Sequence, residues 1–170
     1  MKSLRTLSRD ETGPAPRASP AYSQDLQELW FSLMRRPWAS LTFVPAHESG
    51  SAVALAYALA TIGGRFRGAP IAVLEGLHLD LETAARLTLD VQTAGEQRPT
   101  ASAPRTGPQA EQRRFIVLSS VLGDPMGIPV ALASDGVVLV VDRFVATRAS
   151  ADRTLQAIGR DHVLGAVLVG

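Results

Sequence analysis

The residues best suited to chemistry follow a short apolar run, Leu41–Val44, and precede an alanine-rich stretch. They are Ala46, His47, Glu48, Ser49, Gly50, Ser51 and Ala52. A strand that passes through a tight turn of small residues into a helix N-terminus is the architecture of a phosphate-binding loop, because the first N–H groups of the helix attract an anion. The segment 46–52 is therefore the candidate nucleotide site.

The same segment lacks the residue types that hold a phosphate. A working loop uses several glycines, a lysine for the β- and γ-phosphates and a Ser or Thr for Mg²⁺. Here Gly50 is the only glycine, and Lys2 is the only lysine of the whole chain. The lysine position falls on Ser51 or Ala52, and Glu48 adds a negative charge. We expect a degenerate loop that binds nucleotide weakly at best, with neither ATP nor Mg²⁺ as a cofactor.

Ser49 supports an alternative hypothesis, that of a hydrolase. The chain order of Ser49, Asp142 and His162 is that of an α/β-hydrolase triad, and the turn has the strand–serine–helix context of a nucleophile elbow. However, the first glycine of such an elbow is replaced by His47. The three histidines, which include His78, lack the spacing of metal ligands, so no metal site is predicted.

Composition narrows the class of protein. The chain has 170 residues, of which 46% are hydrophobic and 19% charged, as expected for one globular domain. The net charge of +1 gives no electrostatic case for nucleic acid, and the absence of cysteine excludes disulfides and thiolate metal sites. No apolar run approaches the roughly 20 residues that span a bilayer, and no secretion signal is recognised. We expect a cytoplasmic protein without direct membrane insertion.

Two biased segments interrupt the ordered pattern. Residues 1–20 contain three prolines and read as a flexible leader, and residues 92–112 are rich in Pro, Thr, Ala and Gln. The second segment predicts a long surface loop or disordered insertion. Residues 21–170 then form a single domain.

Within that domain, short apolar runs alternate with helical patterns. The strands are expected at Leu41–Val44, Ile71–Leu74, Phe115–Leu118, Val137–Val141 and Val163–Val169. The helices are expected at Tyr22–Arg35, Ser51–Ile62, Leu81–Val91 (capped by Asp80) and Ser150–Gly159 (after Thr147). This alternation predicts a doubly wound α/β fold with a mainly parallel five-stranded sheet.

Several segments resemble one family. YSQDLQELWFSLMRR, ALASDGVVLVVDRFVATRASADRTLQAI and HVLGAVLVG are similar to parts of the bacterial tyrosine kinases of capsule and exopolysaccharide synthesis, within the MinD/ParA-like P-loop ATPases. The resemblance runs from Tyr22 to Gly170 and implies a P-loop type sheet. It also places the family's Asp-x-Asp pair on Glu75 and Leu77, and its metal-organising aspartate on Ser119. The resemblance thus implies that these three residues occupy vestigial positions of the acids that the family uses.

The resemblance implies a pseudo-ATPase or pseudokinase, because phosphoryl transfer depends on the charges that are missing here. We expect no catalytic residue and a role as an interaction or scaffold protein in exopolysaccharide synthesis or export. Its partner is then a membrane chain-length regulator, a related ATPase or a second copy. Such a partner places the protein at the cytoplasmic face of the inner membrane. A weak nucleotide sensor and the Ser49 hydrolase remain as alternatives.

Overall fold

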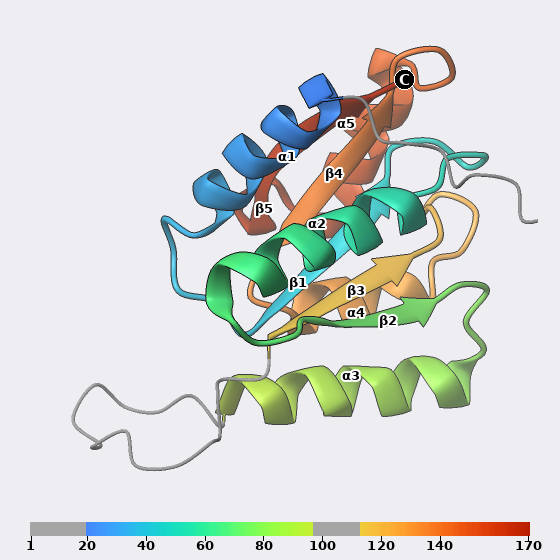
Figure 1. Cartoon of the computed structure of the whole chain (residues 1–170). Helices are drawn as coiled ribbons and strands as arrows, with labels where there is room; N and C mark the ends of the chain where they lie inside the picture. Colours follow the sequence, from blue (N-terminus) through green and yellow to red (C-terminus); the bar gives the residue numbers. More distant parts are fainter. Residues whose placement is uncertain (1–19, 97–112) are drawn as a thin grey trace, which may run out of the picture.

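Five parallel strands form one sheet in the computed structural model, which describes residues 20–96 and 113–170 (Figure 1). The strands are β1 (Ser40–Pro45), β2 (Ala72–Gly76), β3 (Arg114–Leu118), β4 (Val137–Asp142) and β5 (Val163–Val169). Their spatial order is β2-β3-β1-β4-β5, with β2 and β5 at the two outer edges. The central strand β1 is buried along its whole length, as expected for a strand covered on both faces.

Helices cover both faces of the sheet. They are α1 (Pro20–Leu33), α2 (Val53–Arg67), α3 (Leu81–Glu96), α4 (Gly127–Ala133) and α5 (Arg148–Ile158), followed by a short 3₁₀ helix, Arg160–His162. The α2 connection carries the chain from β1 past β3 to β2, whereas α3, α4 and α5 carry it in the opposite direction. Because such crossovers are right-handed, α2 and these three helices must lie on opposite faces.

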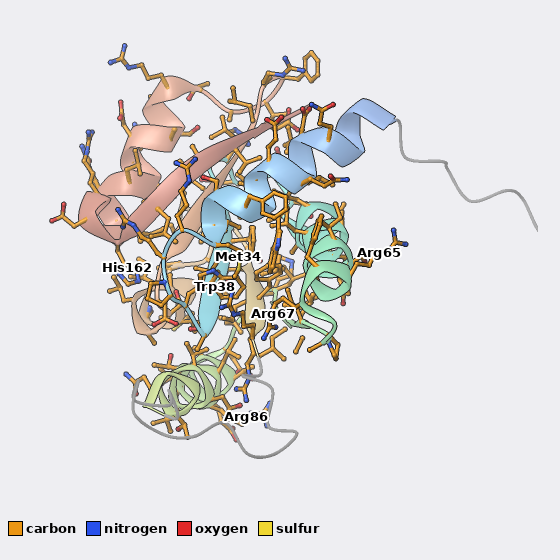
Figure 2. All side chains as sticks on the ribbon, turned by 60° about the vertical axis from the view of Figure 1, so that its left-hand side comes forward. Met34, Trp38, Arg65, Arg67, Arg86 and His162 are labelled. Atoms are coloured by element: carbon orange, nitrogen blue, oxygen red, sulfur yellow. The ribbon has the colours of Figure 1, made fainter. Side chains whose placement is uncertain are left out.

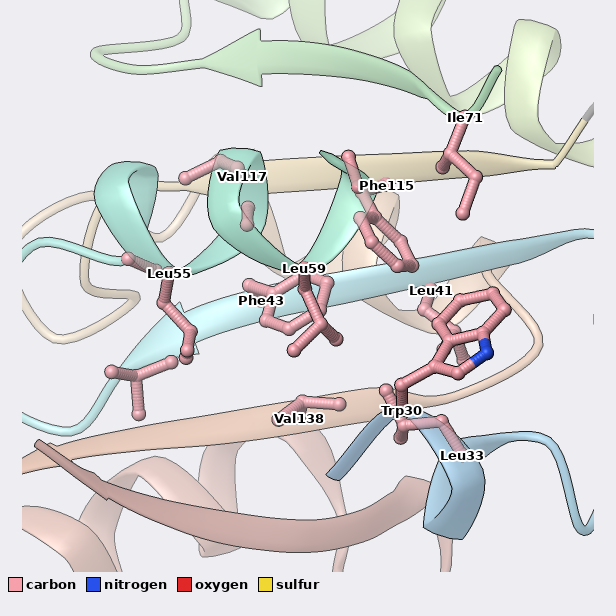
Figure 3. Packing of buried hydrophobic residues seen from close by; sticks show 14 of the residues in the cluster. Trp30, Leu33, Leu41, Phe43, Leu55, Leu59, Ile71, Phe115, Val117 and Val138 are labelled. Carbon is pink, nitrogen blue, oxygen red and sulfur yellow. The ribbon is translucent and has the colours of Figure 1, made fainter. Parts of the chain in front are cut away.

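Two hydrophobic clusters fill these faces. The first joins α1 and α2 to the sheet around Trp30, Leu59, Phe43 and Phe115, all fully buried (Figure 3). The second joins α3, α4 and α5 to the other face and includes Ile116. Since β1, β3 and β4 contribute side chains to both clusters, the sheet couples them.

Local signals explain where several helices begin and end. Asp80 Oδ1 accepts a hydrogen bond from Thr83 N at 2.7 Å, which caps α3 and lowers the pKa of the Asp80 carboxyl. Thr147 and Ser150 form a reciprocal capping box at the start of α5. At the end of α2, Gly68 adopts φ 68°, a left-handed conformation that favours glycine.

The α/β class, the parallel sheet and all five predicted strands are confirmed, with small shifts of their ends. One helix was missed. The segment of α4, GIPVALA, is short and contains Gly127 and Pro129, so it has no helical signature in sequence. Its buried Val130 and Ala131 pack in the second cluster, which supplies the stabilisation that local propensity does not.

The predicted loop at 92–112 is also corrected at its start, because α3 continues through Glu96. The rest of that segment, and residues 1–19 of the predicted leader, lie outside the described residues.

Candidate functional site

The parallel sheet brings the candidate residues to one edge. The loops that follow β1, β2, β3 and β4 all emerge at the carboxyl ends of the strands (Figure 1). We call this the carboxyl edge, and the opposite end of the sheet the amino edge. The chain leaves β1 toward one side of the sheet and leaves its neighbours β3 and β4 toward the other. Ligands of open α/β sheets bind at such a switch point, so the loop after β1 has the expected position for a site.

The loop 46–52 is closed by its own hydrogen bonds. Ser49 N donates to His47 Nδ1 at 3.2 Å, and Gly50 N donates to His47 O at 2.9 Å. Further along, Val53 N donates to Ser51 Oγ at 3.4 Å. A phosphate-binding loop instead directs such N–H groups toward the ligand. Three of the donors are therefore already used within the turn.

Gly50 has a packing role in this turn. A Cβ at this position would lie 2.9 Å from Pro45 Cβ and 3.1 Å from His47 O, which is too close for any other residue without movement. The glycine thus allows the turn to fold back on the end of β1. It is not surrounded by further glycines that could open the backbone to a ligand.

Glu48 belongs to the loop that follows β1, and its side chain lies beside the loop that follows β3. A Cβ built on Gly123 would be 3.6 Å from Glu48 Cγ and 3.9 Å from its Cβ, so the Glu48 side chain lies beside that loop. Its residue is exposed, and the carboxylate is carried at the switch point of the sheet. A negative charge at this place opposes the binding of phosphate.

Glu75, which the resemblance would place at the first acid position, forms a hydrogen bond with a tyrosine. Tyr57 Oη donates to Glu75 Oε1 at 2.8 Å, linking α2 to β2. The hydrogen bond to the carboxylate, together with its negative charge, raises the pKa of Tyr57 above the ordinary value of a tyrosine. Leu77, at the second acid position, is an exposed apolar residue.

Ser119, at the third acid position, has a structural contact. Its Oγ accepts a hydrogen bond from His78 N at 3.2 Å, and His78 has a positive φ of 55°. Beside it, Asp124 Oδ2 accepts from Leu79 N at 2.9 Å and its Oδ1 from Met126 N at 3.3 Å. The bonds from His78 N and Leu79 N join the loops after β2 and β3. Sequence reasoning missed Asp124; its place before Pro125, a usual turn context, was the available signal.

The proposed hydrolase triad is not assembled. Ser49 and Asp142 lie at the carboxyl edge, but His162 precedes β5 and therefore lies at the amino edge. His162 Nε2 is 2.9 Å from the carbonyl oxygen of Ala131. The residue near Ser49 is instead His47, whose Nδ1 lies 3.0 Å from Ser49 Oγ. Within the described residues, no group of three His, Asp or Glu side chains is placed to hold a metal ion.

The carboxyl edge is apolar and acidic. Its exposed large hydrophobic residues are Leu77, Leu81, Met126, Phe144 and Val145. The strand ends, loops and first helical turns there carry six acids, Glu48, Glu75, Asp80, Glu82, Asp124 and Asp142. Only Arg143 and Arg148 balance them in these segments. We call this combination of residues the carboxyl-edge surface.

The amino edge has the opposite charge. Its described loops and helix ends carry seven arginines, Arg35, Arg36, Arg65, Arg67, Arg113, Arg114 and Arg160, against the three acids Glu96, Asp135 and Asp161. Arg65, Arg67 and His162 are labelled in Figure 2, on elements that end or begin at this edge. Not all of this charge is exposed, because Arg113 is buried with its guanidinium 4.4 Å from the Trp38 ring centroid. The near-zero net charge of the chain therefore hides a separation of charge along the strands.

Comparison with protein-family models, with curated proteins and with solved structures gives no match for this chain. Across residues 20–96 and 113–170, none of the helices combines the length and the apolar character that a membrane span requires.

Proposed function

We propose that this protein is a non-catalytic interaction or scaffold protein, a pseudo-ATPase or pseudokinase on a P-loop scaffold of the MinD/ParA-like type. The observation that carries the proposal is the state of the loop 46–52. Its N–H groups at Ser49, Gly50 and Val53 donate within the turn, and Glu48 occupies the switch point with a negative charge.

The acid positions support the same conclusion. Phosphoryl transfer depends on positioning and on stabilising charge with a cation and Mg²⁺. Leu77 and Ser119 carry no charge, and the Glu75 carboxylate accepts a hydrogen bond from Tyr57. Together with Ser51 or Ala52 at the lysine position, these residues leave the reaction without its electrostatic groups.

The carboxyl-edge surface supports a protein partner. Exposed apolar side chains next to acids fit a partner that presents apolar and basic side chains. From the resemblance to the exopolysaccharide kinases, we propose a membrane chain-length regulator or a related ATPase as this partner. The protein would then act in exopolysaccharide synthesis or export, held at the cytoplasmic face of the inner membrane by that partner.

Calorimetric titration with ATP and ADP, each with Mg²⁺, tests the non-catalytic part of the proposal. We expect no heat of binding up to millimolar nucleotide and no release of phosphate from ATP. Glu48→Gln is the informative variant, because it removes the charge while keeping the shape of the side chain. Tight binding of MgATP by the wild-type protein, followed by hydrolysis, would overturn the proposal.

The interaction part is tested by binding to the cytoplasmic segments of the chain-length regulator. We expect Leu81→Ser combined with Phe144→Ser to weaken binding at least tenfold, because both side chains are exposed on the carboxyl-edge surface. Leu89→Ser is the matched control, since Leu89 is exposed on α3 away from that surface. If the Leu81→Ser/Phe144→Ser double variant bound the regulator as tightly as Leu89→Ser, the partner would not bind at the carboxyl-edge surface.

A nucleotide sensor is the second candidate. It is favoured by the N-terminus of α2, because the residue at the N-cap position, Ala52, has no side-chain acceptor for the first N–H groups of the helix. Millimolar binding that becomes stronger in Glu48→Gln would support it.

The hydrolase is the third candidate and depends on the 3.0 Å contact between His47 Nδ1 and Ser49 Oγ. Labelling by a fluorophosphonate probe that disappears in Ser49→Ala would support that reaction.

A further inference from the structure

Helix α1 begins at the carboxyl edge of the sheet. It ends at Leu33, close to the amino edge where β1 starts at Ser40, and Asp25 in its first half lines the same groove as Leu168 near the end of β5. The helix therefore runs opposite to the strands. Figure 1 shows its first turn near the marked C-terminus, which follows β5. Residues 1–19 thus join the described fold at the edge that carries the candidate site.

The first part of that segment is basic and apolar. Residues 2–9 have the sequence KSLRTLSR, with three positive charges, two leucines and no acid. We call residues 2–9 the basic segment. Asp10 and Glu11 follow it, and residues 12–19 are rich in Pro, Ala and Gly.

The carboxyl-edge surface has the complementary chemistry. Its apolar side chains include Phe144, which is 83% exposed, and Leu81, which is 75% exposed. Its two arginines are engaged with other groups, since Arg143 Nη2 donates to the carbonyl oxygen of Gly170 and Arg148 Nε lies 3.9 Å from an oxygen of Asp152. The six acids of the surface therefore outweigh its positive charge, and a segment with leucines and basic side chains matches it.

The connection is long enough for the basic segment to reach this surface. Residues 10–19 span at most about 33 Å at roughly 3.3 Å per residue. The whole width of the five-stranded sheet is about 19 Å at about 4.8 Å per strand. Every loop of the carboxyl edge is thus within reach. Because a short connection gives an effective concentration in the millimolar range, a weak contact is sufficient to hold the segment.

We infer that the basic segment binds to the carboxyl-edge surface of its own chain and covers the candidate site. Lys2, Arg5 and Arg9 meet the acids of the surface, and Leu4 and Leu7 contact its exposed apolar side chains. A partner of the chemistry proposed above must then displace the segment, a consequence that rests on the proposed function. The docking itself does not rest on it, because it is measured on the protein alone.

A spin label on the basic segment tests the inference in the full chain. The protein has no cysteine, so Ser3→Cys provides a single point of attachment. We expect the amide NMR signals of Glu48, Leu81 and Phe144 to lose most of their intensity, and the signal of Arg65 at the amino edge to keep its intensity. Spin-labelled protein is also mixed with isotope-labelled protein that carries no spin label. Equal losses in this mixture would place the segment on a second copy and overturn the inference.

Charge reversal separates binding from the mere attachment of the segment at this edge. Arg5→Glu combined with Arg9→Glu should restore most of the lost intensity, because like charges then face one another. Arg36→Glu combined with Arg65→Glu is the matched control. It changes the net charge equally, but on exposed side chains of the amino edge, and should leave the losses unchanged. Losses that persist in the first variant, or that are equally reduced in the control, would overturn the inference.

Reversal of the acids provides the complementary experiment. Glu48 and Glu82 are exposed on the carboxyl-edge surface, so their substitution by lysine leaves the core intact. In the Arg5→Glu/Arg9→Glu protein, the additional changes Glu48→Lys and Glu82→Lys restore opposite charges. We expect the intensity losses to return in this combined variant. Losses that stay absent there would contradict binding to these acids and overturn the inference.

Discussion

At the scale of single residues, polar side chains at the carboxyl edge are used to join loops. Ser119 Oγ accepts from His78 N across 41 positions of sequence, and Asp124 binds two backbone N–H groups. Since backbone donors near a folded surface need a partner, such side chains stabilise the loops that they connect. Ser119 and Asp124 therefore have a structural use, independent of any ligand.

Asp135 has a similar use at the amino edge. Its Oδ2 accepts from Ala39 N at 2.6 Å and from Ser40 N at 2.9 Å, which fixes the start of β1. We expect Asp135→Ala to lower the free energy of unfolding by about 2 kcal/mol, because two backbone donors lose their acceptor. Asp135→Asn retains an acceptor oxygen and should lose less. Urea denaturation measures both; equal losses would show that these hydrogen bonds are not the cause.

Tyr57 gives a prediction about pH. Its hydroxyl donates to Glu75, and the negative charge raises the pKa of the phenol. The contribution of this bond to stability is complete below the unfolded pKa, near 10, and is lost as the pH rises through the higher folded pKa. We expect Glu75→Gln to lower the pKa of Tyr57 toward its ordinary value. Absorbance at alkaline pH measures this in a Tyr22→Phe background, and an unchanged titration would contradict the pairing.

At the scale of elements, close approach of α1 and α2 depends on one glycine. A Cβ on Gly63 would clash with the Trp30 ring and lie 2.6 Å from Ile71 Cδ1. The neighbouring Gly64 has room, because its nearest contact for a Cβ is 3.6 Å away. Two adjacent glycines of one helix therefore differ in their roles.

This difference predicts opposite effects of the same substitution. Gly63→Ala should destabilise the protein by roughly 1–3 kcal/mol through overpacking. Gly64→Ala should be neutral or stabilise it by about 0.5 kcal/mol, because alanine has the better helix propensity. Thermal and urea unfolding of the two variants provide the measurement. Loss of stability in Gly64→Ala alone would mean that the packing of α1 on α2 is different.

At the scale of the whole molecule, the two faces of the sheet are expected to unfold together. Trp30 and Trp38 both belong to the cluster under α1 and α2, whereas Ile116 points into the cluster on the other face. We expect Ile116→Val to cost about 1 kcal/mol. Because the strands are shared, the midpoint of unfolding should shift by the same amount whether it is followed by tryptophan fluorescence or by circular dichroism. If the midpoint measured by fluorescence were the same in Ile116→Val as in the wild-type protein, the two faces would unfold independently.

The charge separation also belongs to this scale. Acids gather at the carboxyl edge and arginines at the amino edge, because the parallel topology sends each type of loop to one end. An apolar and acidic surface therefore lies at one end of the sheet, and most of the described arginines lie at the other.

The sequence by itself determined the class of fold and much of the candidate site. Val163–Val169 was predicted with the observed bounds, and Asp80 and Thr147 cap helices as expected. These features are local: apolar periodicity and capping depend on a few neighbouring residues. The absence of a lysine near Ser51 was likewise visible without a structure.

Only the tertiary structure decided which residues meet. The order of strands placed β3 beside β1, which brought Glu48 to Gly123, and it sent His162 to the edge opposite Ser49. The short α4 forms because Val130 and Ala131 are buried against other elements. Contacts between distant segments depend on packing and chain direction, which no local pattern contains, and for that reason the carboxyl-edge surface became visible only in the folded protein.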